Sequence, residues 1–290
     1  SSPLECIHDY NDLNNQCPQE EPAGKIDGAL RFDGYNDRLV SIESKNPGSG
    51  SLTVSFWAKY EGTDYYKAHV VYQNSTGGFG RRFDVGFYND DRFFCYLGGG
   101  SELTTAPYPD TGWHHWACTY DAATDERTIY RDGVPIAQDV TPSSATNDYK
   151  TGVGDRFKGV LDEIAIYGNR ALTSEEIHFQ YEQQAPSRTS PIDYDYIDYQ
   201  PNYEFENYYS DVLTDPLGLG LWGTLTWLPN RIVDEPLPDN QGTDAYPINV
   251  EGAIDMTDNL LLLHLDEPEG TGGFLDTSGN GNDASCDGSS

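Results

Sequence analysis

Basic side chains are scarce in this sequence. Among 290 residues, 17 Lys and Arg stand against 48 Asp and Glu, which gives a formal net charge of −31. A surface of this charge repels nucleic-acid phosphates and anionic membranes, so we expect no nucleic-acid partner. Acidic side chains at this density serve mainly as a solubility device, and Ca²⁺ binding is the specific alternative because Ca²⁺ prefers oxygen ligands.

Long apolar runs and helix-favouring residues are also missing. No purely apolar run approaches the ~20 residues that cross a bilayer as a helix, so we expect no membrane insertion. Met occurs once, whereas Gly occurs 30 times, Pro 17 times and Tyr 21 times. This composition predicts few helices and many short strands.

Cysteine is limited to five residues. In an acidic, Tyr-rich β-protein these cysteines favour an oxidising environment, and we expect an extracellular or cell-surface location. The odd number leaves one thiol over, for an intermolecular bond or as a free cysteine.

Short alternating apolar runs separated by turns begin at residue 24. The strongest run is 51–60, and Asp132-Gly133 between two alternating runs predicts a hairpin. Further runs occur at 28–32, 38–42, 70–72, 83–88, 92–97, 113–120, 128–131, 134–138 and 159–167. One helix is expected at 173–181, where Thr173 and Glu176 have the spacing of a capping box. Regular spacing without helical crossovers predicts an all-β antiparallel sandwich.

The chain divides into four parts on this pattern. Residues 1–23 form a Cys-containing loop, and 24–184 form the sandwich. Residues 185–258 are a spacer rich in Tyr and acidic residues, which we interpret as extended chain, with a short β element at 217–228. Residues 259–290 read as the opening strand and loop of a sandwich.

Five motifs carry a resemblance to a known family. GALRFDGYNDRLVSI, SLTVSFWAKYEG, TGWHHWACTYD, TIYRDGVPIA and GVLDEIAIYGNRALTSEEI, in this order, resemble the laminin-G-like branch of the concanavalin A-like lectin/glucanase superfamily. The resemblance implies a jelly-roll sandwich. The closing stretch LLLLHLDEPEGTGGFLDTSGNGNDASC resembles the same family's first strand and loop, which normally precede the GALRFDG strand. The two ends of the module are therefore present in reversed order.

Catalytic chemistry is not predicted. Glucanases of the superfamily need two carboxylates on one face. Asp162 and Glu163 are adjacent, so a regular strand would point them to opposite faces, and Glu204 and Glu206 lie in the spacer. The neighbours His114 and His115 precede Trp116 on a predicted core strand and are expected to be structural. We therefore expect no enzyme.

A cation site is the better-supported chemical hypothesis. Asp276, Ser278, Asn280 and Asn282 place oxygen-bearing side chains at every second position of a glycine-containing loop, which suits Ca²⁺. The resemblance implies a structural Ca²⁺ here, with Asp162 as a contributor. A solvated Asn-Gly turn is the alternative interpretation.

Two disulfides are predicted. Cys95 and Cys118 lie on runs that we expect to be neighbouring strands, so a bond between them is reasonable. In the family, Cys17 and Cys286 would be joined locally. In the reversed order they can pair only between copies or by a long return of the same chain, and Cys6 is an alternative partner for Cys286.

Carbohydrate binding is the family's common activity, and exposed aromatic side chains serve it. The candidates are Tyr35, Tyr65, Tyr66, Tyr88 and Tyr108. Tyr is abundant throughout the chain, so none of these residues stands out.

Three functional hypotheses follow. In the first, the protein is a non-enzymatic structural protein whose Leu260, Leu262 and Leu265 anchor a strand in the next copy, producing a head-to-tail filament. In the second, the chain is a Ca²⁺-dependent glycan-binding or adhesion module from a tandem-repeat cell-surface protein. In the third, the closing strand returns to its own sandwich, which the spacer is long enough to allow at roughly 3.3 Å per residue.

Overall fold

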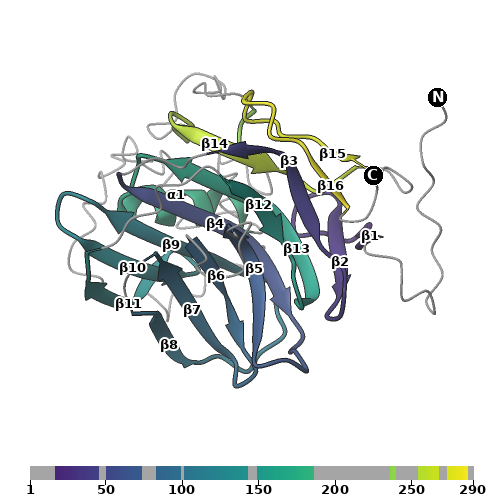
Figure 1. Ribbon diagram of the computed structural model, residues 1–290, viewed down its shortest axis with the longest axis horizontal. Coiled ribbons are helices and arrows are strands. Elements are labelled where there is room, and N and C mark those ends of the chain that lie inside the picture. The colour runs from purple at the N-terminus through teal and green to yellow at the C-terminus, as the bar shows by residue number, and fades with distance from the viewer. Residues whose placement is uncertain are drawn as a thin grey trace, which may run out of the picture.

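The computed structural model describes residues 17–45, 50–73, 83–98, 101–142, 149–185, 236–239, 254–267 and 273–286. Most of the predicted spacer, its β element at 217–228, the carboxylates Glu204 and Glu206, and Cys6 lie outside these ranges. In the described part, two antiparallel sheets pack face to face, as Figure 1 shows. The predicted all-β sandwich is confirmed.

The first sheet has the strand order β1-β2-β13-β4-β9-β10-β11, and β14 also pairs with β13. Its strands are β1 (Gln19–Glu21), β2 (Ala29–Asp33), β4 (Leu52–Tyr60), β9 (His114–Asp121), β10 (Glu126–Arg131), β11 (Val134–Val140), β13 (Lys158–Gly168) and β14 (Asn259–Leu263). β13 is the longest strand and lies beside β4 along most of its length. It is therefore the strand on which this sheet is built.

The second sheet has the order β15-β16-β3-β12-β5-β6-β7-β8. Its strands are β3 (Leu39–Lys45), β5 (Lys67–Gln73), β6 (Phe83–Tyr88), β7 (Arg92–Leu97), β8 (Leu103–Pro107), β12 (Tyr149–Val153), β15 (Gly273–Phe274) and β16 (Ala284–Cys286). Alternate side chains of both sheets fill the core between them, with Phe56, Phe87 and Trp116 near its centre.

Local sequence signals explain two of the connections. Asp132 and Gly133 both have positive φ (52° and 75°), the backbone of the predicted two-residue hairpin between β10 and β11. Helix α1 (Ser174–Gln184) begins with the predicted capping box of Thr173 and Glu176. α1 covers the outer face of the first sheet, where a second apolar cluster includes Tyr167, Ile177 and Leu262.

The C-terminal strands complete this same sandwich. β14 pairs with the second half of β13, where Ile164 faces Leu263, while β2 pairs with the first half. β16 pairs with β3 and thereby extends the second sheet. We expected this segment in a neighbouring copy; the structure instead places it on its own chain, as in the third hypothesis, and residues 259–286 share both sheets with the predicted sandwich (Figure 1).

The anchoring leucines also differ from the prediction. Leu262 and Leu265 are fully buried as expected, but Leu260 is only half-buried. Leu261 and Leu263 point into the core between the sheets, and Leu262 packs under α1. The strand is therefore buried on both faces, which a period-two pattern with one apolar face does not anticipate.

This difference gives a matched pair of variants. Leu262→Ala is expected to lower the free energy of unfolding by about 2–5 kcal/mol, because it removes a buried side chain and leaves a cavity. Leu260→Ala removes the same atoms from a half-buried position and should cost clearly less. Urea denaturation of both variants measures the difference, and equal losses would contradict the placement of β14.

Candidate functional site: the joint that closes the sandwich

The joint is defined here as the contact between residues 254–286 and the rest of the chain. Four groups of interactions form it besides the strand pairing: an arginine network, a side-chain clamp, a buried carboxylate pair and a disulfide. The arginine network, the carboxylate pair and the disulfide link segments far apart in sequence, whereas the clamp forms within residues 259–282. Together they determine whether the sandwich is closed.

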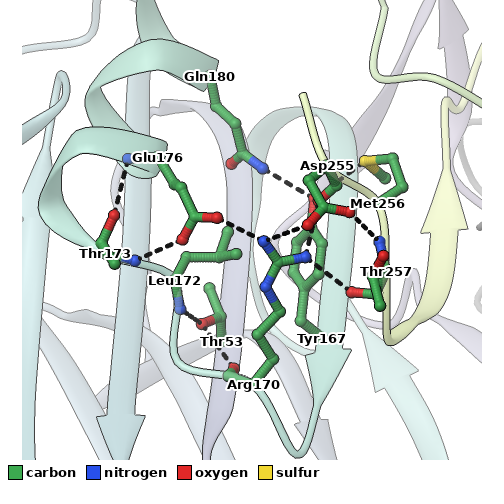
Figure 2. A network of polar contacts seen from close by, with 10 residues as sticks. All are labelled: Thr53, Tyr167, Arg170, Leu172, Thr173, Glu176, Gln180, Asp255, Met256 and Thr257. Carbon is green, nitrogen blue, oxygen red and sulfur yellow. Dashed lines mark hydrogen bonds and ion pairs between the residues drawn. The ribbon is translucent and has the colours of Figure 1, made fainter. Parts of the chain in front are cut away.

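Arg170 is the centre of the first group (Figure 2). Its Nη1 donates to the backbone oxygens of Asp255 and Thr257, at 2.9 Å each. Its Nη2 pairs with the Asp255 carboxylate at 3.0 Å and also with Glu176 of α1. Since Glu176 caps the helix as well, one guanidinium ties the helix start to the returning segment.

A buried hydrogen-bond chain lies beside this arginine. The Tyr167 hydroxyl donates to Met256 Sδ at 3.1 Å and accepts from Gln180 Nε2 at 2.8 Å (Figure 2). Burial raises the pKa of Tyr167, so this phenol stays protonated and can act as a donor. Met256, the only methionine, is fully buried here.

The predicted cation loop is the clamp. Asp276 Oδ1 accepts from the backbone N–H groups of Leu262 and Ser278 (both 3.0 Å), and its Oδ2 accepts from that of Asn282 at 2.7 Å. Asn280 Nδ2 donates to the oxygen of Asn259, and Asn282 Nδ2 donates to that of Leu260. The loop residues therefore bind the backbone of β14 and of the loop itself.

This geometry fits a backbone clamp better than a cation site. The Asp276 carboxylate is committed to N–H donors, and two of the expected ligands present amide nitrogen to β14. Asp162 is not part of the clamp, since its Oδ2 accepts from the N–H groups of Lys25 and Ile26. Among the described residues, no cluster of three or more His, Cys, Asp or Glu side chains is arranged for a metal ion. Calcium binding stays a prediction.

Asp162 and Glu163 form a buried carboxylate pair in β13. The register between β13 and β4 shifts between Asp162 and Ala165, and Glu163 has φ of +50°. This bulge turns both carboxylates to the outer, helix-covered face. Our expectation of opposite faces was therefore wrong, because it assumed an unbroken strand.

Neither carboxylate of this pair is open to solvent, since Asp162 is 0% and Glu163 is 2% exposed. Burial, followed by the charge of Glu163, raises the pKa of Asp162. Burial also raises the pKa of Glu163, against the opposing hydrogen bond from His264. Glu163 Oε2 accepts from Gln184 Nε2 and from the N–H of Leu237, so it joins three separate segments.

His264 connects the tail to this pair. Its Nδ1 lies 2.5 Å from Glu163 Oε1, and its Nε2 lies 3.1 Å from Asp239 Oδ1. Burial lowers the pKa of His264, but hydrogen bonds and charge from Glu163 and Asp239 outweigh it and raise the pKa to about 9. The imidazolium between two carboxylates is an electrostatic latch on the end of β14.

The disulfide Cys17–Cys286 closes the joint covalently across 269 residues of sequence. It forms within one chain, by the long return that the sequence allowed. The other disulfide, Cys95–Cys118, links β7 of one sheet to β9 of the other. The predicted bond is present, and the two strands that it joins face each other across the core.

The tyrosines proposed for glycan binding lie at one end of the sandwich. Tyr35 follows β2, Tyr65 and Tyr66 precede β5, and Tyr88 ends β6. Tyr66 and Tyr35 are exposed, Tyr65 is half-buried, and Tyr88 is buried with its hydroxyl bonded to Glu102. Tyr108, after β8, stacks on Arg131 at the same end.

The two adjacent histidines are placed as structural residues. His115 is fully buried against Trp57 and Tyr181, and burial lowers its pKa to about 4. His114 is bonded to Asp132 at 2.7 Å and to Asp110 at 2.5 Å. Burial lowers the pKa of His114, but the hydrogen bonds that both carboxylates accept from its ring outweigh this and raise the pKa.

Sequence reasoning missed Arg170, Glu163 and His264 as joint residues. No local motif marks them, because their partners are more than 80 residues away or belong to another element. The one available signal was the rarity of basic residues: an Arg three residues before the helix cap Thr173, in so acidic a chain, points to a specific acidic contact.

The central part of the chain matches a known protein family. Residues 33–178, half of the chain, match the family described as the concanavalin A-like lectin/glucanases superfamily. The chain belongs to this superfamily. The predicted resemblance is confirmed, and the matched range ends within α1, before the spacer and the joint segment. No curated relative was found by sequence comparison.

Solved structures with a similar sandwich have low sequence identity. A native heptameric SAP-like pentraxin from Limulus polyphemus is 11% identical, with a TM-score of 0.44, over 54% of this chain and 82% of that chain. Domain 4 of the extracellular arabinanase AbnA from Geobacillus stearothermophilus, in complex with arabinotriose, is 20% identical, with a TM-score of 0.42, over 55% and 78%. A Trypanosoma rangeli sialidase is 13% identical, with a TM-score of 0.44, over 61% of this chain and 32% of the sialidase.

The latch predicts a pH dependence of stability. Because the pKa of His264 is raised from 6.5 to about 9 in the folded state, its contribution is complete below pH ~6.5 and is lost as pH rises toward ~9. The loss is about 3 kcal/mol by linkage. His264→Gln should flatten the stability profile between pH 6.5 and 9, as measured by urea denaturation. An unchanged slope in that variant would refute the latch. His178→Gln is the control, because His178 is half-buried on α1, pairs with Glu182 and does not contact the joint segment in any bond described.

Proposed function

We propose that this protein is a non-catalytic, extracellular structural protein whose joint segment, residues 254–286, is exchanged between copies to link chains head to tail. The observation that carries the proposal is that strands completing both sheets come from the far end of the sequence. A second copy could supply the same segment with the same contacts. Contact between copies would therefore use the same residues that close the sandwich within one chain, and no additional interface.

Exchange is supported by the physics of the joint. The connection between α1 and the segment spans residues 186–253, and it carries the segment either back to its own β13 or across to another. Return within one chain competes with exchange at an effective concentration that is on the order of mM for segments joined by a linker. Exchange should therefore rise with protein concentration. Donor and acceptor are different surfaces, so the contact need not close and can propagate.

The disulfides and the buried carboxylates support the other parts of the proposal. Two disulfides in a sandwich domain fit an oxidising, extracellular environment. Glycoside hydrolysis would need two accessible carboxylates, and the adjacent pair in the sandwich is Asp162 and Glu163. Both are buried and bonded to backbone or side-chain donors. They serve the joint, which favours a non-catalytic role. The described residues contain no helix long and apolar enough to cross a membrane.

A cysteine trap tests exchange directly. One variant carries Cys6→Ser and Cys286→Ser, and the other carries Cys6→Ser and Cys17→Ser, so neither can form the joint disulfide alone. Refolded together in an oxidising buffer, they should form a disulfide-linked dimer that increases with concentration and disappears on reduction. Non-reducing electrophoresis measures it.

Each variant refolded by itself is the control for other disulfides. A mixture that yields no more covalent dimer than the separate variants, at all concentrations up to the millimolar range, would refute exchange. If exchange occurs, wild-type protein at high concentration should also form polymers visible by electron microscopy, and deletion of residues 259–290 should remove them.

A second candidate function, glycan binding, is favoured by the tyrosine end of the sandwich. The Tyr66 ring packs edge-on against Tyr88, with centroids 5.2 Å apart, and remains 68% exposed. The Arg92 guanidinium lies 4.6 Å from the Tyr88 ring centre, and Arg156 lies 4.6 Å from that of Tyr65. A flat exposed ring beside charged hydrogen-bonding groups suits the apolar face and hydroxyls of a sugar.

Glycan binding has its own variant test. If an array identifies a ligand, Tyr66→Ala should weaken it at least tenfold, because the ring supplies the stacking face, while leaving the melting temperature unchanged. Val140→Ala is the control and should have no effect, because Val140 is equally exposed but lies at the end of β11 that is far from the tyrosines. An array without hits, or equal binding by Tyr66→Ala, would count against this function.

A further inference from the structure

A cavity of about 290 Å³ lies between α1 and the start of the joint segment. Leu172, Phe179 and Ile254 provide its apolar walls. Leu172 and Ile254 are buried, and Phe179 is partly buried in the same outer cluster. The cavity is much larger than the ~30 Å³ that one water occupies in the liquid. It can therefore hold an organic group of several heavy atoms.

Gln180 lines this cavity and carries a buried, unpaired oxygen. The residue is 2% exposed, and its Oε1 has no hydrogen-bond partner among the described residues. Gln180 Nε2 donates to the Tyr167 hydroxyl, which in turn donates to Met256 Sδ. The oxygen therefore faces away from Tyr167, as Figure 2 shows. A buried acceptor without a partner is costly, and a donor in the cavity would remove that cost.

The other polar groups on the cavity wall are carboxylates. Glu175, Glu176 and Asp255 contribute to its lining. Arg170 pairs with Glu176 and Asp255, but its two donor nitrogens are already directed to these carboxylates and to backbone oxygens. Glu175 on the exposed first turn of α1 adds a further negative charge. The wall thus offers hydrogen-bond acceptors and negative charge, and no side-chain donor.

We propose that this cavity binds an organic ammonium: a primary ammonium group on an apolar stem. The ammonium donates to Gln180 Oε1 and is balanced by the surrounding carboxylates, and the stem packs against Leu172, Phe179 and Ile254. An anion would be repelled by three carboxylates. A neutral alcohol could donate one hydrogen bond but would leave the negative charge uncompensated.

The site is built by the closed joint and does not depend on exchange between copies. Ile254 and Asp255 belong to the joint segment, whereas Leu172 and Gln180 belong to the body of the sandwich. A ligand that bridges them binds only when this part of the joint is formed. Binding should therefore stabilise the closed sandwich in proportion to ligand concentration.

Three probes of equal length test the class of ligand on the full chain: n-hexylammonium, n-hexanol and hexanoate. Hexylammonium should bind in the millimolar range or tighter, and hexanol and hexanoate at least tenfold more weakly, as measured by chemical-shift titration and by the rise in melting temperature. N-acetyl-lysine methylamide, added as a fourth probe, mimics a lysine side chain of a protein. If N-acetyl-lysine methylamide binds, the natural ligand is a lysine side chain on a protein surface. If it does not bind while hexylammonium does, the natural ligand is a free amine.

Variants identify the cavity as the place of binding. Phe179→Ala should weaken hexylammonium at least fivefold by removing a wall, and Glu175→Gln should weaken it two- to threefold and reduce its salt dependence. Glu126→Gln, an exposed carboxylate on β10, is the control and should leave binding unchanged. Failure of both ammonium probes to bind, hexanol binding as well as hexylammonium, or binding insensitive to Phe179→Ala would each overturn the proposal.

Discussion

The pairing of β14 with the second half of β13 is the interaction on which the rest of this structure depends. β13 is shared by β4 along one side and by two strands, β2 and β14, along the other. Without β14, half of one side of β13 would carry unpaired backbone groups, and Leu261, Leu263 and Leu265 would leave the core. The helix, the clamp loop and the disulfide all act on this one edge.

The bulge at Asp162 and Glu163 lies where β2 ends its pairing and β14 begins. In sequence along β13, Leu161 pairs with Leu30 and Ile164 pairs with Leu263, so the two carboxylates occupy the gap between the strands. The backbone of the tail passes close to the start of β2 at this gap, since a Cβ on Gly28 would lie 3.1 Å from Asp266 Cα. A break in the edge leaves N–H groups of Lys25 and Ile26 to be satisfied, and Asp162 accepts both. The burial of the Asp162 and Glu163 carboxyl groups is thus a consequence of filling one edge of β13 with two separate strands.

The sequence predicted the sandwich, the hairpin and the capping box, because each of these depends on local patterns of period two or on a few adjacent residues. It also predicted that residues 259–290 are the opening strand and loop of a sandwich, although their partner is β13 and not the strand at 28–32. It did not predict the orientation of Asp162 and Glu163, because a bulge depends on the register of neighbouring strands. Arg170 and His264 escaped for a similar reason: their roles come from backbone and carboxylate partners that only the fold brings together. The clamp loop shows the limit of motif reading, because oxygen-rich side chains at alternate positions suit a cation and a peptide backbone equally well.

The order of the strands also has a kinetic consequence. During synthesis, residues 17–185 emerge before residues 254–286, so the second half of β13 remains an open edge until the tail is made. The contacts of the joint span long stretches of sequence, which makes their formation slow relative to local hairpins such as β10–β11. During that interval the edge is available to any copy of β14 at sufficient concentration. Once His264 reaches Glu163 and Cys286 reaches Cys17, the arrangement that formed first is retained, because the disulfide must break before the segment can leave. Under the exchange proposed above, the protein concentration during folding would decide whether the joint closes within one chain, as in this structure, or between two chains.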